Sequence, residues 1–144
     1  MKQVYVNNFL SFPKCQLENP KLINIRGCNG SGKSTIPMSI IAADPMTFEV
    51  VGMYGGKPKV IATVSPKFKM IMLGHYHSKT GGMDTINSTD IIKEITRAFW
   101  NTSFHILMEG ILASTVRQTY IDLFCELNYD LKRREIIIYN ILPP

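Results

Sequence analysis

Apolar runs alternate with amphipathic stretches along the chain. Residues 22–27, 104–112 and 135–142 are mostly apolar and short, and they are bounded by Gly, Pro or polar residues. Such runs are typical of buried β-strands. Residues 89–100 and 114–127 instead place apolar side chains three or four positions apart, which predicts helices with one buried face. Strands that alternate with helices predict an α/β fold with a mainly parallel sheet.

The segment between the first strand and the helix at 89–100 has a different pattern. Residues 48–53, 60–64 and 70–73 are β-rich runs separated by Gly and Pro, and Gly55-Gly56-Lys57-Pro58 is a turn signal. We therefore expect a β-hairpin around residues 48–73 in addition to the parallel strands.

A helix is predicted over residues 33–43, directly after a Gly-rich turn. Pro37 falls inside it. Proline has no N–H and crowds the carbonyl four residues earlier, so we expect a kink or a short first helix.

Length and composition fit a single cytoplasmic domain covering residues 1–144. Hydrophobic residues make up 45% of the chain and charged residues 19%, which is typical of soluble globular proteins. No apolar run approaches the roughly 20 residues of a membrane span, and the N-terminus lacks a signal-peptide pattern. The three cysteines are widely spaced and predict free thiols.

Positive charge is concentrated in the first half. Residues 1–73 contain nine Lys/Arg and three Asp/Glu, a balance of +6, out of a net charge of +5 for the whole chain. Lys57, Lys59, Lys67 and Lys69 are close together in sequence. Such a cluster suits a polyanion such as DNA, because lysine–phosphate contacts release counterions. The alternative is a solvated, lysine-rich hairpin.

The first strand leads into a phosphate-binding motif, G-x-x-x-x-G-K-[ST]. Glycines let backbone amides turn inward, and with the following helix N-terminus these amides form an anion site. Lys33 can reach the β- and γ-phosphates of ATP, and the Ser34 hydroxyl can ligate Mg²⁺. An accidental match in a Gly-rich turn is the alternative. The residues expected to bind the nucleotide are Gly27, Cys28, Asn29, Gly30, Ser31, Gly32, Lys33, Ser34 and Thr35.

Three further residues are candidates for the same site. Glu109 follows an apolar run and precedes Gly110, as does the carboxylate that organises Mg²⁺ in P-loop enzymes; it could also be an ordinary charge at a strand end. Asp84 belongs to a Gly-rich loop, residues 73–85, and could accept a proton from an acceptor hydroxyl. Arg117, early in the next helix, could point at substrate or γ-phosphate, or be a solvated helix charge.

The same loop contains His75, Tyr76 and His77. If it lies over the carboxyl edge of the sheet it faces the phosphates, and Tyr76 or His75 could stack on a base. The alternative is a turn with capping polar groups.

Three segments together resemble P-loop kinases of the nucleoside-monophosphate-kinase type, and in particular phage-encoded 5-hydroxymethyluracil DNA kinases. They are I-N-x-R-G-x-x-G-S-G-K-[ST] at 23–34, L-G-x-Y…G-G-x-D-x-I at 73–86, and three apolar residues before Glu109-Gly110. The resemblance implies a three-layer P-loop NTPase fold and an ATP- and Mg²⁺-dependent phosphotransferase. The γ-phosphate would pass to a hydroxyl, most specifically that of 5-hydroxymethyluracil in viral DNA, in the host cytoplasm.

Two departures from that group leave alternatives open. Such kinases usually continue into an arginine-bearing lid, whereas this sequence stops at Pro144. We expect that the lid is lost, that Arg117 and the lysines replace it, or that the chain is a fragment. Residues 1–20 are an N-terminal extension similar to the start of RecF- and SMC-type ATPases. The alternatives are therefore a nucleotide or nucleoside kinase, and a DNA-associated ATPase or ATP-binding module that transfers no phosphate.

Overall fold

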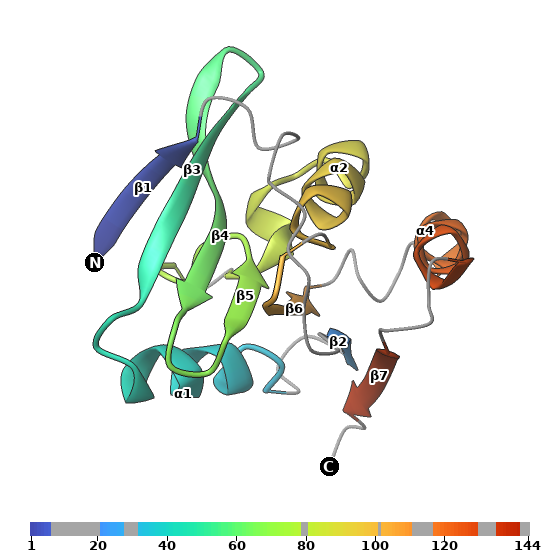
Figure 1. The fold of residues 1–144 in the computed structure, drawn as a ribbon, viewed down its shortest axis with the longest axis horizontal. Coiled ribbons are helices and arrows are strands. Elements are labelled where there is room, and N and C mark those ends of the chain that lie inside the picture. The colour runs from blue at the N-terminus through green and yellow to red at the C-terminus, as the bar shows by residue number, and fades with distance from the viewer. Residues whose placement is uncertain are drawn as a thin grey trace.

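The structure of the chain is a computed structural model that describes residues 1–6, 21–27, 32–78, 81–100, 102–110, 117–129 and 135–141 (Figure 1). Within these residues one sheet has the strand order β1-β3-β4-β5-β6-β2-β7. The strands are β1 (Lys2–Val6), β2 (Lys21–Gly27), β3 (Phe48–Tyr54), β4 (Lys57–Ser65), β5 (Met70–Leu73), β6 (His105–Glu109) and β7 (Glu135–Ile141).

The sheet is mainly parallel, as the sequence predicts. The pairs β1–β3, β5–β6, β2–β6 and β2–β7 are parallel. Only β4 runs the other way, pairing antiparallel with both β3 and β5. The expected hairpin around residues 48–73 is thus a three-stranded meander inside the main sheet. Its tip, Gly55-Gly56, has φ of 60° and 72°, the left-handed conformation that tight two-residue hairpin turns require.

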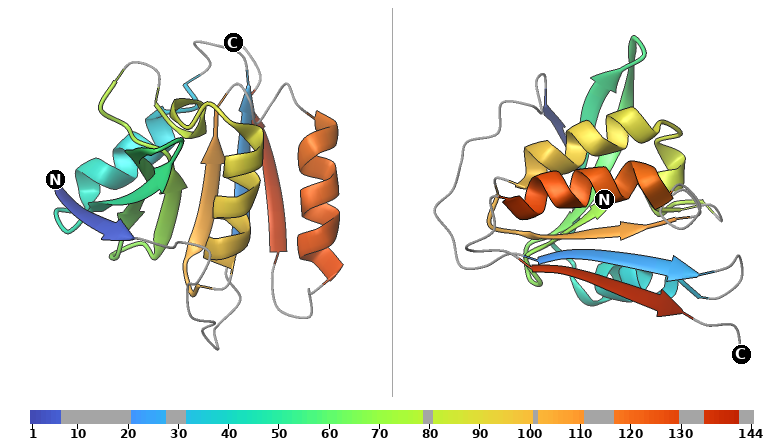
Figure 2. Two further views of the ribbon diagram at one scale, coloured as in Figure 1. Left: turned by 90° about the horizontal axis from the view of Figure 1, so that it is seen from above. Right: turned by 90° about the vertical axis from the view of Figure 1, so that its right-hand side faces the viewer.

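Helices cover both faces of the sheet, which confirms the three-layer prediction (Figure 2). Helix α1 (Thr35–Ala43) lies on one face, and α2 (Thr89–Trp100) and α4 (Arg117–Tyr129) lie on the other. A short 3₁₀ helix, η2 (Met83–Thr85), precedes α2. No helix in these parts of the chain combines the length and the apolar character that a membrane span requires.

The larger core lies between the sheet and α2 with α4. Alternate residues of the strands and one face of each helix meet there, so their side chains are fully buried; they include Ile61, Leu73, Ile92, Ile95, Ile106, Tyr120 and Leu123. Complete burial of such a side chain contributes about 1.5–3 kcal/mol. A smaller cluster on the α1 face joins Met72 and Leu107 with Ile40, Ile41 and Tyr76.

Two details differ from the sequence expectation. Helix α1 begins at Thr35, two residues later than predicted, so Pro37 lies in its first turn and the helix continues to Ala43. The first-turn amides have no partner inside a helix, so proline is tolerated there. The structure thus has one continuous helix from Thr35 to Ala43, where the sequence predicts a kink or a short first helix. In addition, the start of the N-terminal extension forms β1, an edge strand paired with β3.

Asp44 joins the end of α1 to the β4–β5 turn. Its buried carboxylate accepts hydrogen bonds from the Ser65 hydroxyl, from the Lys67 amide at 3.0 Å and from the Met46 amide at 2.9 Å. The Ser65 bond, helped by those two amides and the Lys67 charge, lowers the pKa of Asp44 from its usual 3.8 although burial opposes the shift.

We predict that Asp44→Asn lowers the melting temperature at neutral pH. A carboxylate whose pKa is depressed by folding stabilises the protein above its unfolded pKa and loses this effect as pH falls. The difference from wild type should thus be complete above pH ~4 and shrink below it. Thermal unfolding followed by circular dichroism from pH 7 to pH 2.5 measures this; a difference that grows on acidification would contradict the assignment.

Candidate active site

The phosphate-binding motif lies between β2 and α1. Gly27 is the last residue of β2, and Thr35 is the first residue of α1. Gly32 has φ of 85°, and the Thr35 amide donates to its carbonyl at 3.0 Å. Lys33 is buried. Cys28, Asn29, Gly30 and Ser31 lie outside the described residues. The described part of the motif therefore has the strand–turn–helix context that a phosphate loop needs.

Ser34 and Glu109 meet at the carboxyl edge of the sheet. Strand β6 pairs with β2 so that Glu109 is opposite Ile25. The Ser34 hydroxyl donates to Oε1 of Glu109 at 3.0 Å, and the Glu109 residue is 2% exposed. The two residues predicted to organise Mg²⁺ are thus in direct contact, although they are 75 positions apart.

Pro37 helps to explain this contact. Ser34 is the N-cap of α1, yet its side chain makes no capping hydrogen bond. An N-cap hydroxyl usually accepts from the amide of the second or third helical residue. The third residue here is Pro37, which has no amide hydrogen, so one of the two usual donors is missing. The Ser34 hydroxyl points to Glu109 instead.

The surroundings of the Glu109 carboxylate raise its pKa and leave one of its oxygens without a partner among the described residues. Burial raises its pKa above the usual 4.5 and Asp84 raises it further, whereas the Ser34 bond and the Lys33 charge lower it. Its other oxygen, Oε2, is buried without a hydrogen-bond partner among the described residues. A buried carboxylate oxygen with no donor, beside a serine hydroxyl, fits a hard divalent cation such as Mg²⁺, which takes oxygen ligands.

Residues 74–78 and 81–85, called the site loop below, place Asp84 beside Glu109. The loop is closed by an antiparallel bridge between His75 and Gly82, with the Gly82 amide donating to the His75 carbonyl at 2.9 Å. A Cβ added to Gly82 would collide with Glu109. A Cβ added to Gly110 would come within 2.7 Å of Asp84 Oδ1. Because both glycines lack side chains, the two carboxylates can share the end of β6.

Two tyrosine hydroxyls also approach these carboxylates. The hydroxyls of Tyr76, in the site loop, and Tyr120, on α4, are buried without a hydrogen-bond partner in the described part of the chain. Burial raises the pKa of both; Asp84 raises it further for each, and Glu109 does so for Tyr76. Both hydroxyls therefore stay protonated and can donate a hydrogen bond to a bound group. The periodicity of α4 predicted Tyr120 only as a core residue.

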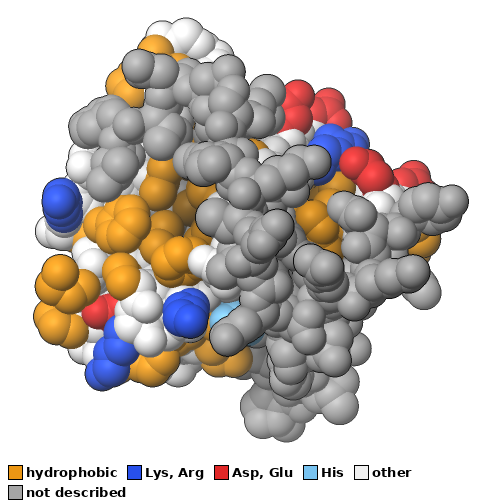
Figure 3. Space-filling view, in the orientation of Figure 1, with side chains coloured by type: hydrophobic (Ala, Val, Ile, Leu, Met, Phe, Trp, Pro, Cys, Tyr) orange, Lys and Arg blue, Asp and Glu red, His pale blue; other side chains and the backbone are white. Residues whose placement is uncertain are grey.

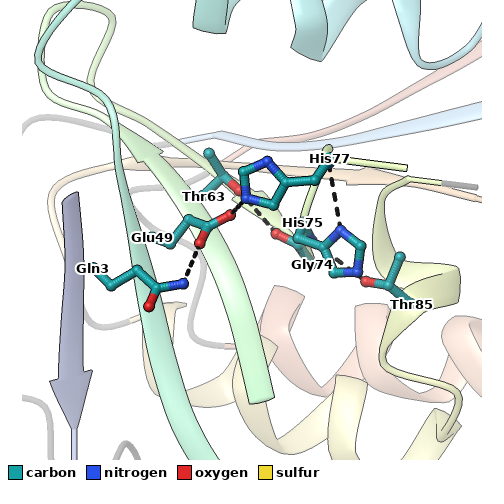
Figure 4. A network of polar contacts seen from close by, with 7 residues as sticks. All are labelled: Gln3, Glu49, Thr63, Gly74, His75, His77 and Thr85. Atoms are coloured by element: carbon teal, nitrogen blue, oxygen red, sulfur yellow. Dashed lines mark hydrogen bonds and ion pairs between the residues drawn. The ribbon is translucent and has the colours of Figure 1, made fainter. Parts of the chain in front are cut away.

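A second polar network holds the site loop against the sheet (Figure 4). The Thr63 hydroxyl donates to the Gly74 carbonyl at 2.9 Å. His77 forms an ion-pair contact with the buried Glu49 of β3, which also accepts from the Gln3 amide at 2.6 Å. Sequence reasoning missed this network, although a lone carboxylate within a β-rich run was a signal for it. The ring of His75, one of the two candidates with Tyr76 for stacking on a base, stacks on His77 at 5.7 Å between centroids.

The structure describes the four lysines but not the side chain of Arg117. Arg117 is the first residue of α4, and its side chain lies outside the described part of the structure, so its role stays a prediction. The four lysines do not form one cluster. Lys57 and Lys59 begin β4, whereas Lys67 and Lys69 follow its other end. On the face shown in Figure 3, the visible Lys and Arg side chains likewise form separate small groups.

The mainly parallel three-layer fold, with the β2–turn–α1 motif and the Ser34–Glu109 pair at its carboxyl edge, is of the P-loop NTPase class. The family model described as 5-hmdU DNA kinase matches residues 9–138. The chain belongs to that family.

Curated phage proteins agree with this assignment. The chain is 42% identical over 124 residues to the 5-hmdU DNA kinase of Bacillus phage SP10, covering 85% of this chain and 19% of that protein. It is 32% identical over 123 residues to 5-hmdU DNA kinase 1 of Salmonella phage ViI, covering 81% and 54%. The corresponding protein of Pseudomonas phage PaMx11 is 35% identical over 96 residues, covering 65% and 50%. The chain thus spans about half the length of the Salmonella and Pseudomonas phage proteins and about a fifth of the length of the Bacillus phage protein. No solved structure gives a significant match.

The raised pKa of Glu109 predicts that replacing this residue stabilises the ligand-free protein. A carboxyl whose pKa is raised by folding destabilises the protein as pH rises through its unfolded pKa. Glu109→Gln should therefore raise the melting temperature of the ligand-free protein at pH 7 and leave it unchanged below pH ~4. Glu126→Gln is the control, because the Arg97 hydrogen bond lowers the pKa of Glu126, so this substitution should give no gain at pH 7. Equal behaviour of the two variants would refute the burial effect.

Proposed function

We propose that the chain is an ATP- and Mg²⁺-dependent kinase that transfers the γ-phosphate of ATP to the hydroxyl of 5-hydroxymethyluracil in DNA. One observation carries the proposal: Ser34 and Glu109 are hydrogen-bonded, and Lys33 and Asp84 lie close enough to Glu109 to change its pKa. Membership of the 5-hmdU DNA kinase family supports the acceptor. Phosphoryl transfer asks mainly for positioning and charge stabilisation, which such a set of residues can provide.

Each residue has a distinct role in the proposal. Lys33, with the amides of the phosphate-binding motif, binds the β- and γ-phosphates. The Ser34 hydroxyl and Glu109 would hold Mg²⁺, which would neutralise charge on the phosphate oxygens when bound. Asp84 orients the acceptor hydroxyl and takes its proton as the new P–O bond forms and the bond to the β-phosphate oxygen breaks. The Tyr76 and Tyr120 hydroxyls, which have no partner in the described part of the chain, would donate to a bound group.

The proposal is tested by incubating the protein with γ-labelled ATP, Mg²⁺ and duplex DNA containing 5-hydroxymethyluracil. Wild type should label the DNA, and Lys33→Ala should abolish labelling without unfolding the protein. Asp84→Asn should lower kcat about 10²- to 10⁴-fold, the usual contribution of a positioned general base. Asp90→Asn is the matched control, because Asp90 is exposed at the start of α2 and pairs with Lys93.

The same assay with other acceptors distinguishes the remaining candidate functions. Label on free nucleosides or nucleotides, with none on DNA, would contradict the DNA acceptor. Release of inorganic phosphate without any labelled acceptor would contradict a kinase and indicate an ATPase. Full activity of Asp84→Asn would remove Asp84 from the reaction while leaving the kinase assignment intact.

A further inference from the structure

The four lysines near β4 lie in two pairs, one at each end of that strand. The two pairs are therefore at opposite ends of the neighbouring parallel strands. Lys57 and Lys59 belong to the tip of the β3–β4 hairpin, residues 53–59, called the basic hairpin below. Lys67 and Lys69 belong to the β4–β5 turn. In Figure 1 the hairpin is at the top of the molecule, whereas the β4–β5 turn lies beside α1.

The strand register shows which edge carries the candidate active site. Met72 is paired with Leu107, so Gly74 is level with Glu109. The Gly74 amide donates to the Ile61 carbonyl of β4 at 2.9 Å, which brings Ile61 to the same level. Lys57 is four residues beyond Ile61, or about 13 Å at the usual rise per residue, and β4 is two strands, about 10 Å, from β6. The basic hairpin therefore begins at the sheet edge that holds Glu109, and the twist of the sheet turns it from the direction of β6 so that it projects past α2 (Figure 2).

The other two lysines are at the far edge. Lys69 accepts a hydrogen bond at its carbonyl from the amide of His105, the first residue of β6, at 2.7 Å. Lys67 Nζ donates to the Ala43 carbonyl at the end of α1 at 3.0 Å. The length of β6 thus separates this pair from Glu109, and one of the two already binds a helix C-terminus.

The basic hairpin has a defined shape and exposed charge. Lys57 and Lys59 are exposed. Lys59 Nζ lies 4.7 Å from the centroid of the Tyr54 ring, and the Tyr54 hydroxyl donates to the Ile86 carbonyl at 3.4 Å. This bond ties the hairpin to the segment between Asp84 and α2. Within β3 and the hairpin the only acidic residue is Glu49, which is buried near the other end of β3.

We propose that the basic hairpin binds the phosphate backbone of acceptor DNA next to the active site, whereas Lys67 and Lys69 take no part. This deepens the proposed function and rests on it. A free nucleoside has no flanking backbone phosphates for the hairpin to contact, and the spacings along the sheet put Lys57 more than about 10 Å from Glu109. Duplex DNA carries a charge about every 1.7 Å along its axis, so its flanking phosphates can reach both places at once.

Two double variants with the same charge change test the proposal: Lys57→Gln with Lys59→Gln, and Lys67→Gln with Lys69→Gln. Binding of a labelled 20-bp hydroxymethyluracil duplex is measured by fluorescence anisotropy at 50 and 200 mM salt. The hairpin variant should bind on the order of tenfold more weakly at 50 mM, and its slope of log K against log salt should be shallower by about 2. The control variant should match wild type.

Turnover gives a second readout. The hairpin variant should raise KM for the duplex by a similar factor with kcat unchanged, and should leave KM for ATP unchanged. Equal loss of binding in both variants, or no loss in the hairpin variant, would overturn the proposal. If wild type labels no DNA, the proposed function fails; the anisotropy measurement still tests the hairpin separately, because it needs no turnover.

Discussion

The hydrogen bond from the Ser34 hydroxyl to Glu109 connects the two halves of the candidate site. It joins the start of α1 to the end of β6, and it requires β2 and β6 to be neighbours in parallel register. It also leaves Glu109 Oε2 buried without a donor among the described residues. A buried carboxylate that is only partly satisfied destabilises the ligand-free fold. A cation that completed the coordination of this oxygen would offset that cost.

Glycine makes the rest of the site possible. The end of β6 has to accommodate Asp84 next to Glu109, although two neighbouring carboxylates repel each other. Gly82 and Gly110 remove the side chains that would otherwise separate them, and Gly74 allows the loop to pass within contact of Gly82. The local sequence therefore favours close approach over stability, a trade-off common at functional sites.

Much of the architecture follows from patterns that the sequence contains. Apolar runs and helical periodicity identified β2, β6, β7, α2 and α4. The sequence made Glu109 and Asp84 candidates for one site, on the condition that the Gly-rich loop lies over the carboxyl edge of the sheet. The predictions that failed were those that depended on strand direction and on contacts between residues distant in sequence. Four lysines within thirteen positions look like one patch, yet a nine-residue strand places them at opposite edges. Residues 2–6 pair with the edge that β3 offers, and packing alone brings the Tyr76 and Tyr120 hydroxyls near Asp84.

The reversal of β4 has two consequences for function. It places the basic hairpin at the same edge of the sheet as the proposed chemistry. It then returns the chain so that β5 can run parallel to β6, and the loop after β5 consequently leaves the sheet over Glu109. In the proposed kinase, the phosphate donor would thus be held by β2 and α1, and the acceptor by elements of a meander inserted between α1 and α2. A change in the length of that meander could alter the acceptor while Ser34 and Glu109 stay in place.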